Sequence, residues 1–349
     1  MSNQVSTTVI EKRIEDILDT IEHDREREII SRRFGLFDRK ETLEQIGELL
    51  GITRERVRQL EKAMVAKLKA AASQADLPQI KLIEKELLDT LGKMGQVARI
   101  QDLGKALTGS QERLDQSRIL FLAELCPKIA VIDENDHYFY AAGIKEVHNE
   151  KSIRDQVQKI VDSIKKIGKP TTIDQIANTI NNSSSEHTKA LASISKQLAT
   201  LNNRWGLIKW PMVNPKNIRD KIYVTLHDHG KPMHFNEISK AIKGSSFKRK
   251  DVTTQAIHNE LIKDKRFILI GRGIYALKEW GYDKGTVADI IADVLKKAKE
   301  PLHRDDIVKR VLESRQVKET TILLNLQGKP QFERVAKATY TLAEQTEVS

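Results

Sequence analysis

Four segments of this 349-residue chain repeat one order of sequence features, and this repeat limits the possible folds more than any other property. Each segment has an apolar-periodic helix, a short connector, an acidic or amide residue followed by Leu or Ile, a second helix and a β-rich end. The connectors read GQVARIQDL, GKPTTIDQI, GKPMHFNEI and KEPLHRDDI. Their last residues, Leu103, Ile176, Ile238 and Ile307, are spaced by 73, 62 and 69 residues. The pattern predicts an array of similar small modules, and we assign these apolar residues to their cores.

The β-rich ends predict a closing hairpin in each module. They read KIAVIDENDHYFYAAG, RWGLIKWPMV, RFILIGRGIYALKEW and QFERVAKATYTLAE. In the third end, Phe267, Leu269 and Ile274 alternate with polar or glycine positions, and GRG supplies the turn. The fourth end lacks this glycine pair, so its hairpin has a weaker turn signal. Three helices followed by a closing hairpin, in modules of this length, predict winged helices.

A further helical segment precedes the array. Residues 9–72 are predicted to be helical throughout, with breaks at Gly35–Arg39 and Gly51–Ile52. The following AAASQADLPQ is predicted to be a linker that ends at Pro78.

Two short helices around Gly51 are typical of a helix-turn-helix. Thr42 and Gln45 form a capping box, Gly51 ends the first helix, and Thr53 caps the second. The apolar residues of the first helix are expected to form its buried side: Leu43, Ile46, Leu49 and Leu50. A tight glycine turn between two short helices therefore predicts a helix-turn-helix motif.

The second of these helices has an apolar and a polar face. At about 100° per residue, Leu60, Met64 and Leu68 fall within about 60° of Val57. Ile52 and Val57 occupy the positions of a hydrophobic staple around Thr53. The opposite face carries Glu55, Arg58, Gln59 and Lys62, with Arg54 at its N-terminal flank.

The polar face suits the edges of base pairs. Arg, Glu and Gln side chains match the donors and acceptors of guanine, cytosine and adenine in the major groove, and base contacts concentrate at the start of a recognition helix. The net charge of +10 also favours a polyanionic partner. The alternatives are a solvated mixed-charge face and a merely soluble basic surface. The aromatic content of 5% does not favour a surface that binds single strands by rows of stacked bases.

Residues 25–69, REREIISRRFGLFDRKETLEQIGELLGITRERVRQLEKAMVAKLK, closely resemble region 4 of housekeeping-type bacterial sigma factors. The matching pieces are the R-E-x-x-I/V-x-x-x-R-F-G-L run, the T-L-E-E/Q-I-G helix and the T-R-E-R-V/I-R-Q-L/I-E helix. The resemblance implies that this helix reads a minus-35 promoter element and that the domain docks on the flap of the RNA polymerase β subunit. The base-contacting positions would be Arg54, Glu55, Arg58 and Gln59, and the positions near phosphates would be Thr53, Arg56 and Lys62. Nothing in the chain resembles region 2, which melts the minus-10 element, so action as a complete sigma factor is not expected.

The third and fourth repeats, residues 230–345, resemble HARE-type helix-turn-helix domains. The third carries GKPMHFNEISKAI followed by TTQAIHNELIKDKRFILIGRGIYALKEWGY, and the fourth carries EPLHRDDIVKRVL followed by TTILLNLQGKPQFERVAKATYTL. HARE-type domains occur in the RNA polymerase delta subunit and in chromatin and restriction proteins, which implies DNA or polymerase contact. The first two repeats are only winged-helix-like.

The third repeat contains a basic run, SKAIKGSSFKRK, with no acidic residue. Its cations are Lys240, Lys243, Lys248, Arg249 and Lys250. The run leads into a predicted recognition helix that begins at Thr253–Thr254. That helix has Gln255, His258 and Asn259 as polar residues and Ile257 and Leu261 as inward ones.

We expect Lys248, Arg249 and Lys250 to contact phosphates, and Arg272 of the GRG wing to meet a phosphate or enter a minor groove. The alternative is a basic connector that keeps the array soluble.

The residues that could carry chemistry are few. HRDD, residues 303–306, could suggest a metal site, but Asp305 and Asp306 are better explained as charges at a helix N-terminus. The single cysteine, Cys126, lies in an apolar run, so we expect it to be buried and expect no disulfide within the chain or Cys-type zinc site. His227 and His229 have no second cluster to complete a site. We therefore predict no enzyme, no metal, no cofactor and no small-molecule ligand.

The sequence predicts a mainly α protein with an N-terminal helix-turn-helix and about four winged-helix modules with small β-hairpin wings. The expected domains are residues 1–73, 79–146, 152–213, 214–281 and 285–345. The expected function is reading of a minus-35-like element in double-stranded DNA, with contact to core RNA polymerase. The alternatives are a delta-like polymerase accessory protein and a non-specific architectural DNA-binding protein. With a polar N-terminus and no apolar run long enough to span a membrane, we expect a bacterial cytoplasmic protein associated with the nucleoid.

Overall fold

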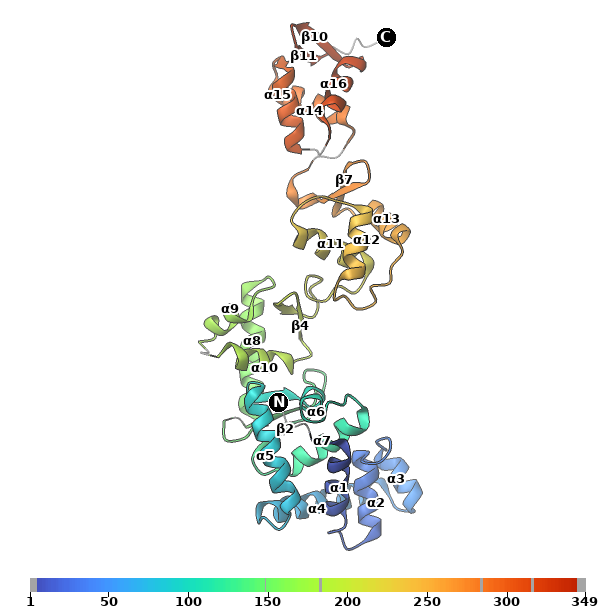
Figure 1. The fold of residues 1–349 in the computed structure, drawn as a ribbon, viewed down its shortest axis with the longest axis vertical. Helices are drawn as coiled ribbons and strands as arrows, with labels where there is room; N and C mark the ends of the chain where they lie inside the picture. Colours follow the sequence, from blue (N-terminus) through green and yellow to red (C-terminus); the bar gives the residue numbers. More distant parts are fainter. Residues whose placement is uncertain (1–4, 148, 182–183, 283–284, 315–316, 344–349) are drawn as a thin grey trace. The chain divides into compact units, whose positions relative to one another are not determined.

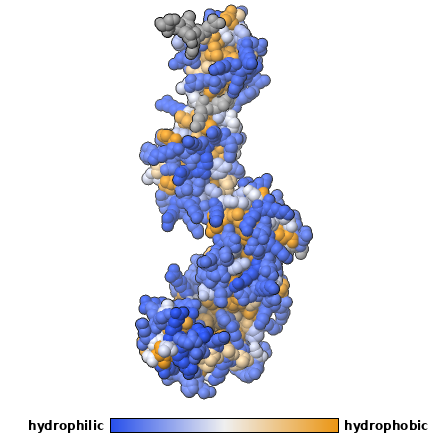
Figure 2. Space-filling view, turned by 180° about the vertical axis from the view of Figure 1, so that it is seen from behind, coloured by the Kyte–Doolittle hydropathy of each residue, from blue (hydrophilic) through white to orange (hydrophobic). Residues whose placement is uncertain are grey.

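The computed structural model describes residues 5–147, 149–181, 184–282, 285–314 and 317–343 (Figure 1). These residues are mainly helical, with small antiparallel sheets between and after the helices, which confirms the predicted fold class. The chain divides into two compact units, residues 1–209 and 210–349. Within the described residues, no helix is long and apolar enough to cross a membrane. On the face drawn in Figure 2, hydrophilic residues cover most of the surface.

Four helices begin the first unit: α1 (Thr7–Leu18), α2 (Asp24–Phe34), α3 (Leu43–Leu50) and α4 (Arg54–Ser73). The prediction of unbroken helix before Gly35 is wrong, because α1 ends at Leu18 and α2 begins at Asp24. The Thr20 hydroxyl donates to the Ile17 carbonyl (2.6 Å), and Arg27 Nη2 donates to the Ile21 carbonyl (3.0 Å). Between α1 and α2, these side chains thus donate hydrogen bonds to backbone carbonyls that have no partner within a helix, and this allows the chain to turn.

The turn between α3 and α4 forms as predicted. The Gln45 N–H donates to Thr42 Oγ1 (3.2 Å), and the Thr42 N–H donates to Gln45 Oε1 (2.9 Å), which completes the capping box. Gly51 ends α3 at φ 66°, a conformation that favours glycine. Gly47 allows a close approach, since a β-carbon there would lie 2.6 Å from the Ile52 carbonyl oxygen.

A small core holds the helix-turn-helix together. It consists of Ile29, Ile46 and Val57, with Leu43, Leu50, Ile52 and Leu60 packed against them. The prediction that Leu49 belongs to this side is wrong, because its side chain is 55% exposed. Helix α3 packs through Ile46 and the buried Gly47, and Leu49 lies beside that stripe.

The first winged-helix module follows almost directly. Its elements are α5 (Pro78–Lys93), β1 (Val97–Arg99), α6 (Ile100–Thr108), α7 (Arg113–Leu125), β2 (Ile129–Ile132) and β3 (Ala141–Ile144), with sheet order β1-β3-β2. The predicted linker is too long, because α4 continues to Ser73 and α5 begins at Pro78. Cys126 is buried as expected, at 3% exposure.

The N-terminal helices and this module share one hydrophobic core. This core contains side chains from both parts: Ile14 of α1, Met64 and Leu68 of α4, Leu87 of α5 and Phe121 of α7. The ring of Phe34 lies 4.9 Å from that of Phe121 in an edge-on arrangement. The two parts therefore pack as one body around α7.

The second module contains α8 (Glu150–Ile167), α9 (Ile173–Thr179), α10 (Ser185–Ser193), β4 (Leu198–Leu201) and β5 (Arg204–Leu207). The prediction for its hairpin is wrong in position: β4 precedes RWGLIKWPMV, and only the first four residues of that segment form a strand. Asn202 and Asn203 both have positive φ, 49° and 60°, and form the two-residue turn between β4 and β5. Asn tolerates this conformation, which suits a tight hairpin without glycine.

The third module lies in the second unit. It contains α11 (Ile218–His229), β6 (Met233–His234), α12 (Phe235–Gly244), α13 (Thr254–Lys263), β7 (Phe267–Gly271), β8 (Ile274–Leu277) and η1 (Lys278–Trp280), with sheet order β6-β8-β7. The predicted inward side of β7 is wrong at Leu269, which is 47% exposed, whereas Ile268 and Ile270 are buried. Ile268 and Ile270 form a second small core with Ala276, against which Trp280 packs. Phe267, whose side chain points to the other face of β7, is also buried, so the strand buries residues on both faces.

The fourth module contains α14 (Val287–Ala298), β9 (Leu302–His303), α15 (Arg304–Ser314), α16 (Glu319–Gly328), β10 (Phe332–Ala336) and β11 (Thr339–Leu342), with sheet order β10-β11-β9. Its hairpin forms without the glycine pair, because Ala338 takes φ 57° in the turn. The four repeat markers are confirmed as core, each at 0% exposure: Leu103, Ile176, Ile238 and Ile307.

Candidate nucleic-acid interface

Helix α4 presents its two faces as predicted. Thr53 Oγ1 accepts a hydrogen bond from the Arg56 N–H (3.2 Å) and caps the helix. Val57, Met64 and Leu68 are 0%, 8% and 4% exposed, so the apolar stripe faces the core. The opposite side of the helix is left to solvent.

The four predicted base-reading residues stand together on the exposed side, and they form hydrogen bonds and ion pairs. Arg58 Nε and Nη2 donate to the two Glu55 carboxylate oxygens at 2.8 and 2.7 Å, and Gln59 Nε2 donates to Glu55 Oε1 at 3.3 Å. Arg54 Nη1 lies 2.8 Å from Glu44 Oε1. The hydrogen bonds from Arg58, the largest cause, lower the pKa of Glu55 from 4.5 to about 2. The face thus carries a fixed carboxylate between cationic and amide donors.

The predicted phosphate-contacting residues of this helix are also exposed. Arg56 Nη1 donates weakly to Gln59 Oε1 (3.5 Å), and Thr53 uses its hydroxyl for the cap. Lys62, one turn further along, makes no ion pair with any described acid. The cation at Lys62 is therefore available to an anionic partner.

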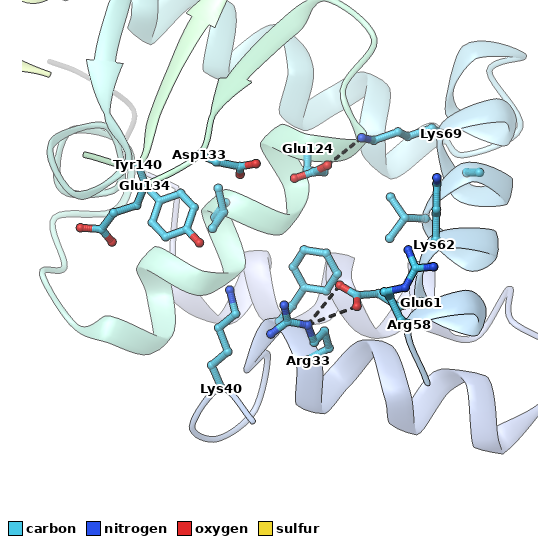
Figure 3. A pocket seen from close by; sticks show the side chains of 14 residues that line it. Arg33, Lys40, Arg58, Glu61, Lys62, Lys69, Glu124, Asp133, Glu134 and Tyr140 are labelled. Atoms are coloured by element: carbon cyan, nitrogen blue, oxygen red, sulfur yellow. Dashed lines mark hydrogen bonds and ion pairs between the residues drawn. The ribbon is translucent and has the colours of Figure 1, made fainter. Parts of the chain in front are cut away.

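A pocket of about 670 Å³ lies beside α4 in the first unit (Figure 3). Arg58 and Lys62 line it from α4, and Asp133 and Glu134 line it from the loop between β2 and β3. This acidic loop, residues 133–136, was not predicted as part of the site, because only the tertiary fold brings it to the reading helix. It places negative charge beside the surface that would meet phosphates.

Comparison with known proteins identifies this part of the chain. The family model for sigma-70, region 4 matches residues 23–70. Residues 23–70 are a sigma-70 region 4 domain. Two similar proteins are the RNA polymerase sigma factors SigA of Listeria monocytogenes and Listeria innocua, each 42% identical over 69 residues. The aligned segment is 20% of this chain and 18% of each relative, so the chain matches less than a fifth of their length.

The N-terminal helices of the chain pack on α7, the third helix of the first module. In three-helix DNA-binding domains such as the homeodomain, the third helix is the one that enters the major groove. The Arg118 side chain of α7 is 5% exposed: Nε donates to the Leu36 carbonyl (2.8 Å), and Nη2 lies 3.0 Å from a Glu11 carboxylate oxygen. Helix α7 therefore packs against the N-terminal helices of the same chain. The sequence pattern did not predict this contact.

The wing of the first module is also engaged. Residues Tyr138 and Ser195 form an antiparallel bridge. The Phe139 N–H donates to the Ile194 carbonyl (3.0 Å), and the Lys196 N–H donates to the His137 carbonyl (2.7 Å). The wing pairs with the second module and is not free to enter a minor groove.

The basic loop of the third module is exposed and anchored. Lys248, Arg249 and Lys250 are all exposed, and Arg249 has a positive φ of 54°. The buried Lys221 donates from Nζ to the Arg249 carbonyl (2.7 Å). Burial, and then the charge of Arg249, lower the pKa of Lys221. A buried cation thus fixes the backbone of this loop.

The predicted recognition helix of the third module forms, with Thr253 as its cap and Ile257 and Leu261 buried. His258 is not a free polar residue, because its ring lies 4.9 Å from that of Phe235 and 6.2 Å from that of Tyr275. Gln255 donates to Asn259 Oδ1 (3.0 Å). Arg272 is exposed in the turn between β7 and β8.

The HRDD segment lies where predicted, at the start of a helix. Asp305 and Asp306 belong to the first turn of α15, and Asp305 contacts Arg304 (3.1 Å) and His303 (3.4 Å). Within the described residues, no three His, Cys, Asp or Glu side chains gather as a metal site would require.

Proposed function

We propose that this chain is a DNA-binding transcription protein whose region 4 domain reads a minus-35-like promoter element in double-stranded DNA. The observation that supports this most is the exposed group of Arg54, Glu55, Arg58 and Gln59 at the start of α4. Guanidinium, carboxylate and amide groups pair with guanine, cytosine and adenine edges. The start of a recognition helix is where such contacts concentrate.

Phosphate contacts would flank this group. In the region 4 domain, the proposed phosphate-contacting residues are Thr53, Arg56 and Lys62. In the third module they are Lys248, Arg249, Lys250 and Arg272, which are all exposed. We propose that the third and fourth modules are HARE-type domains and that the third adds sequence-independent affinity. Such contacts make binding fall steeply with salt.

The test is a selection of sites from a random duplex library by the full chain and by Arg58→Ala. We expect the variant to lose about 10- to 100-fold in affinity for the preferred site and to relax preference at one base position. Lys85→Ala, an exposed cation on α5, is the control and should select the same site as the unchanged chain. An unchanged preference in Arg58→Ala would exclude α4 as the reader.

The proposed protein partner is core RNA polymerase, through the flap of its β subunit, and the proposed location is the bacterial cytoplasm, at the nucleoid. The role is non-catalytic. The proposed modules are residues 1–73, 79–146, 152–213, 214–281 and 285–345. The shared core of the first two means that they would act together.

A second candidate is a delta-like polymerase accessory protein that uses winged helices to bind protein. The buried face of α7 favours it, because one winged helix of this chain already packs on protein instead of presenting its third helix. Capture of core polymerase by the full chain, surviving the triple change K248Q/R249Q/K250Q and combined with no base preference, would support it. Strong DNA affinity without preference or polymerase capture would instead indicate an architectural protein.

A further inference from the structure

A second pocket, of about 520 Å³, adjoins the pocket of Figure 3 and has no lining residue from the reading helix. It does not include Arg58 or Lys62, but it shares five lining residues with the pocket of Figure 3: Phe34, Lys40, Leu120, Glu134 and Tyr140. The rest of its lining comes from Arg99 and the first turn of α6, from the N-terminal half of α7, and from Phe139 in the loop between β2 and β3. It is therefore a distinct lobe, enclosed by the region 4 domain and the first module, and its size suits a small ligand.

The charge of this lobe favours an anion. Three cations line it, Lys40, Arg99 and Arg113. Lys40 and Arg113 are exposed and pair with no acid among the described residues. The one acid in the lining, Glu134, is held by Lys196 at 2.7 Å. Two cations are thus left for an incoming charge, and the positive ends of two helices add to their field.

The lobe also offers ring faces. Phe34, Phe139 and Tyr140 line it, each half-buried. The Arg99 guanidinium already lies 4.2 Å from the centre of the Phe139 ring, and Lys40 Nζ lies 5.6 Å from the centre of the Tyr140 ring. Cations beside aromatic rings in a groove are the surroundings in which nucleobases stack.

Polar side chains complete the lining. Gln101 and Gln116 can donate to and accept from the edge of a base, and Ser117 can bond a sugar or phosphate oxygen. Cations, rings and amides in one pocket match the three parts of a nucleotide. A simple anion would leave the rings unused, and a simple aromatic compound would leave the cations unpaired.

We propose that this lobe binds a nucleoside phosphate, either free or at the end of a nucleic acid strand. The phosphate is held by Lys40 and Arg113, and the base stacks on Tyr140. This site is separate from duplex reading by α4, and its ligand is of a kind that the sequence pattern did not predict.

The test is calorimetric titration of the full chain with the four nucleoside monophosphates, with a nucleoside, and with inorganic phosphate. We expect at least one nucleotide to bind, more tightly than phosphate or the nucleoside alone. Arg113→Gln and Lys40→Gln should each weaken binding about tenfold, because a charged hydrogen bond is lost. Tyr140→Leu, which keeps an apolar side chain, should weaken it at least about fivefold through lost stacking. Lys62→Gln, in the neighbouring pocket only, should leave binding unchanged.

A short single strand with a 5′-phosphate distinguishes the two sources. Binding of this strand but not of mononucleotides, with the same sensitivity to Arg113→Gln, assigns the site to strand ends. Absence of binding for every probe overturns the proposal, as does binding that ignores Arg113, Lys40 and Tyr140. Equal affinity for inorganic phosphate and nucleotide overturns the stacking role of Tyr140. Because Arg113 lies outside the reading face, site selection by duplex DNA should be the same in Arg113→Gln, so the two proposals can fail independently.

Discussion

The side chains at the start of α4 already bond one another. Glu55 accepts hydrogen bonds from Arg58 and Gln59, so these donors are held in place by a carboxylate rather than extended into solvent. A base edge must compete with that carboxylate for the Arg58 guanidinium. Because all three side chains are exposed, this exchange takes place in water and is readily reversible.

The Glu55 carboxyl should titrate far below its ordinary range. Its folded-state pKa of about 2 lies below the ordinary value of 4.5, so its contribution to stability is fully present above pH 4.5 and is lost as the pH falls through about 2. Carbon-13 NMR of the side-chain carboxyl would measure this. In Arg58→Ala we expect the pKa of Glu55 to rise toward 4.5, because its main donor is gone. Titration near 4.5 in the unchanged chain would show that the Glu55–Arg58 bonds do not persist in solution.

At the scale of elements, sequence predicted what depends on near neighbours. The capping box at Thr42, the glycine turn at Gly51 and the stripe through Val57 follow from local chemistry, and all three are confirmed. The exposure of Leu49 and Leu269 was missed, because it depends on which neighbouring element covers each side. The acidic loop beside α4 was missed for the same reason.

That acidic loop should weaken binding to any DNA duplex. Asp133 lies across the pocket from Arg58 and Lys62, so it repels phosphates that approach those cations. We expect Asp133→Asn to tighten binding about two- to fivefold at low salt, equally for all sequences, and to have little effect at high salt. Salt-dependent binding assays would measure it, with Asp89→Asn on the exposed side of α5 as the control. A gain restricted to one sequence would mean that Asp133 acts on base reading instead.

On the scale of the whole molecule, the region 4 domain is not a separate folding unit in this chain. Met64 and Leu68 of α4 share their core with α5 and α7. The bridge between Tyr138 and Ser195 joins the second module to the same unit. The predicted array has the helices and the closing hairpin of each module in the right order, but it missed the short strands β1, β6 and β9 in the connectors. A sequence repeat also cannot show which modules bury surface against one another.

Phe121→Ala should therefore destabilise the reading helix from a distance. Phe121 is fully buried between the two parts, and its loss should cost about 3–5 kcal/mol in unfolding free energy. Amide hydrogen exchange should accelerate in α4 and α7 together. Ile290→Ala, buried in the fourth module, is the matched control and should leave exchange in α4 unchanged. Faster exchange in α7 alone would contradict a shared core.

The shared core also bears on how this protein can be cut for experiments. The family match ends at residue 70, but Met64 and Leu68 belong to a core that also contains Phe121 and Leu122. A fragment that ends at residue 70 would expose the apolar side chains of Met64 and Leu68 to water, and exposed apolar patches promote self-association. The shortest fragment suited to binding assays is set by where the packing closes, at about residue 209, rather than by where the resemblance stops.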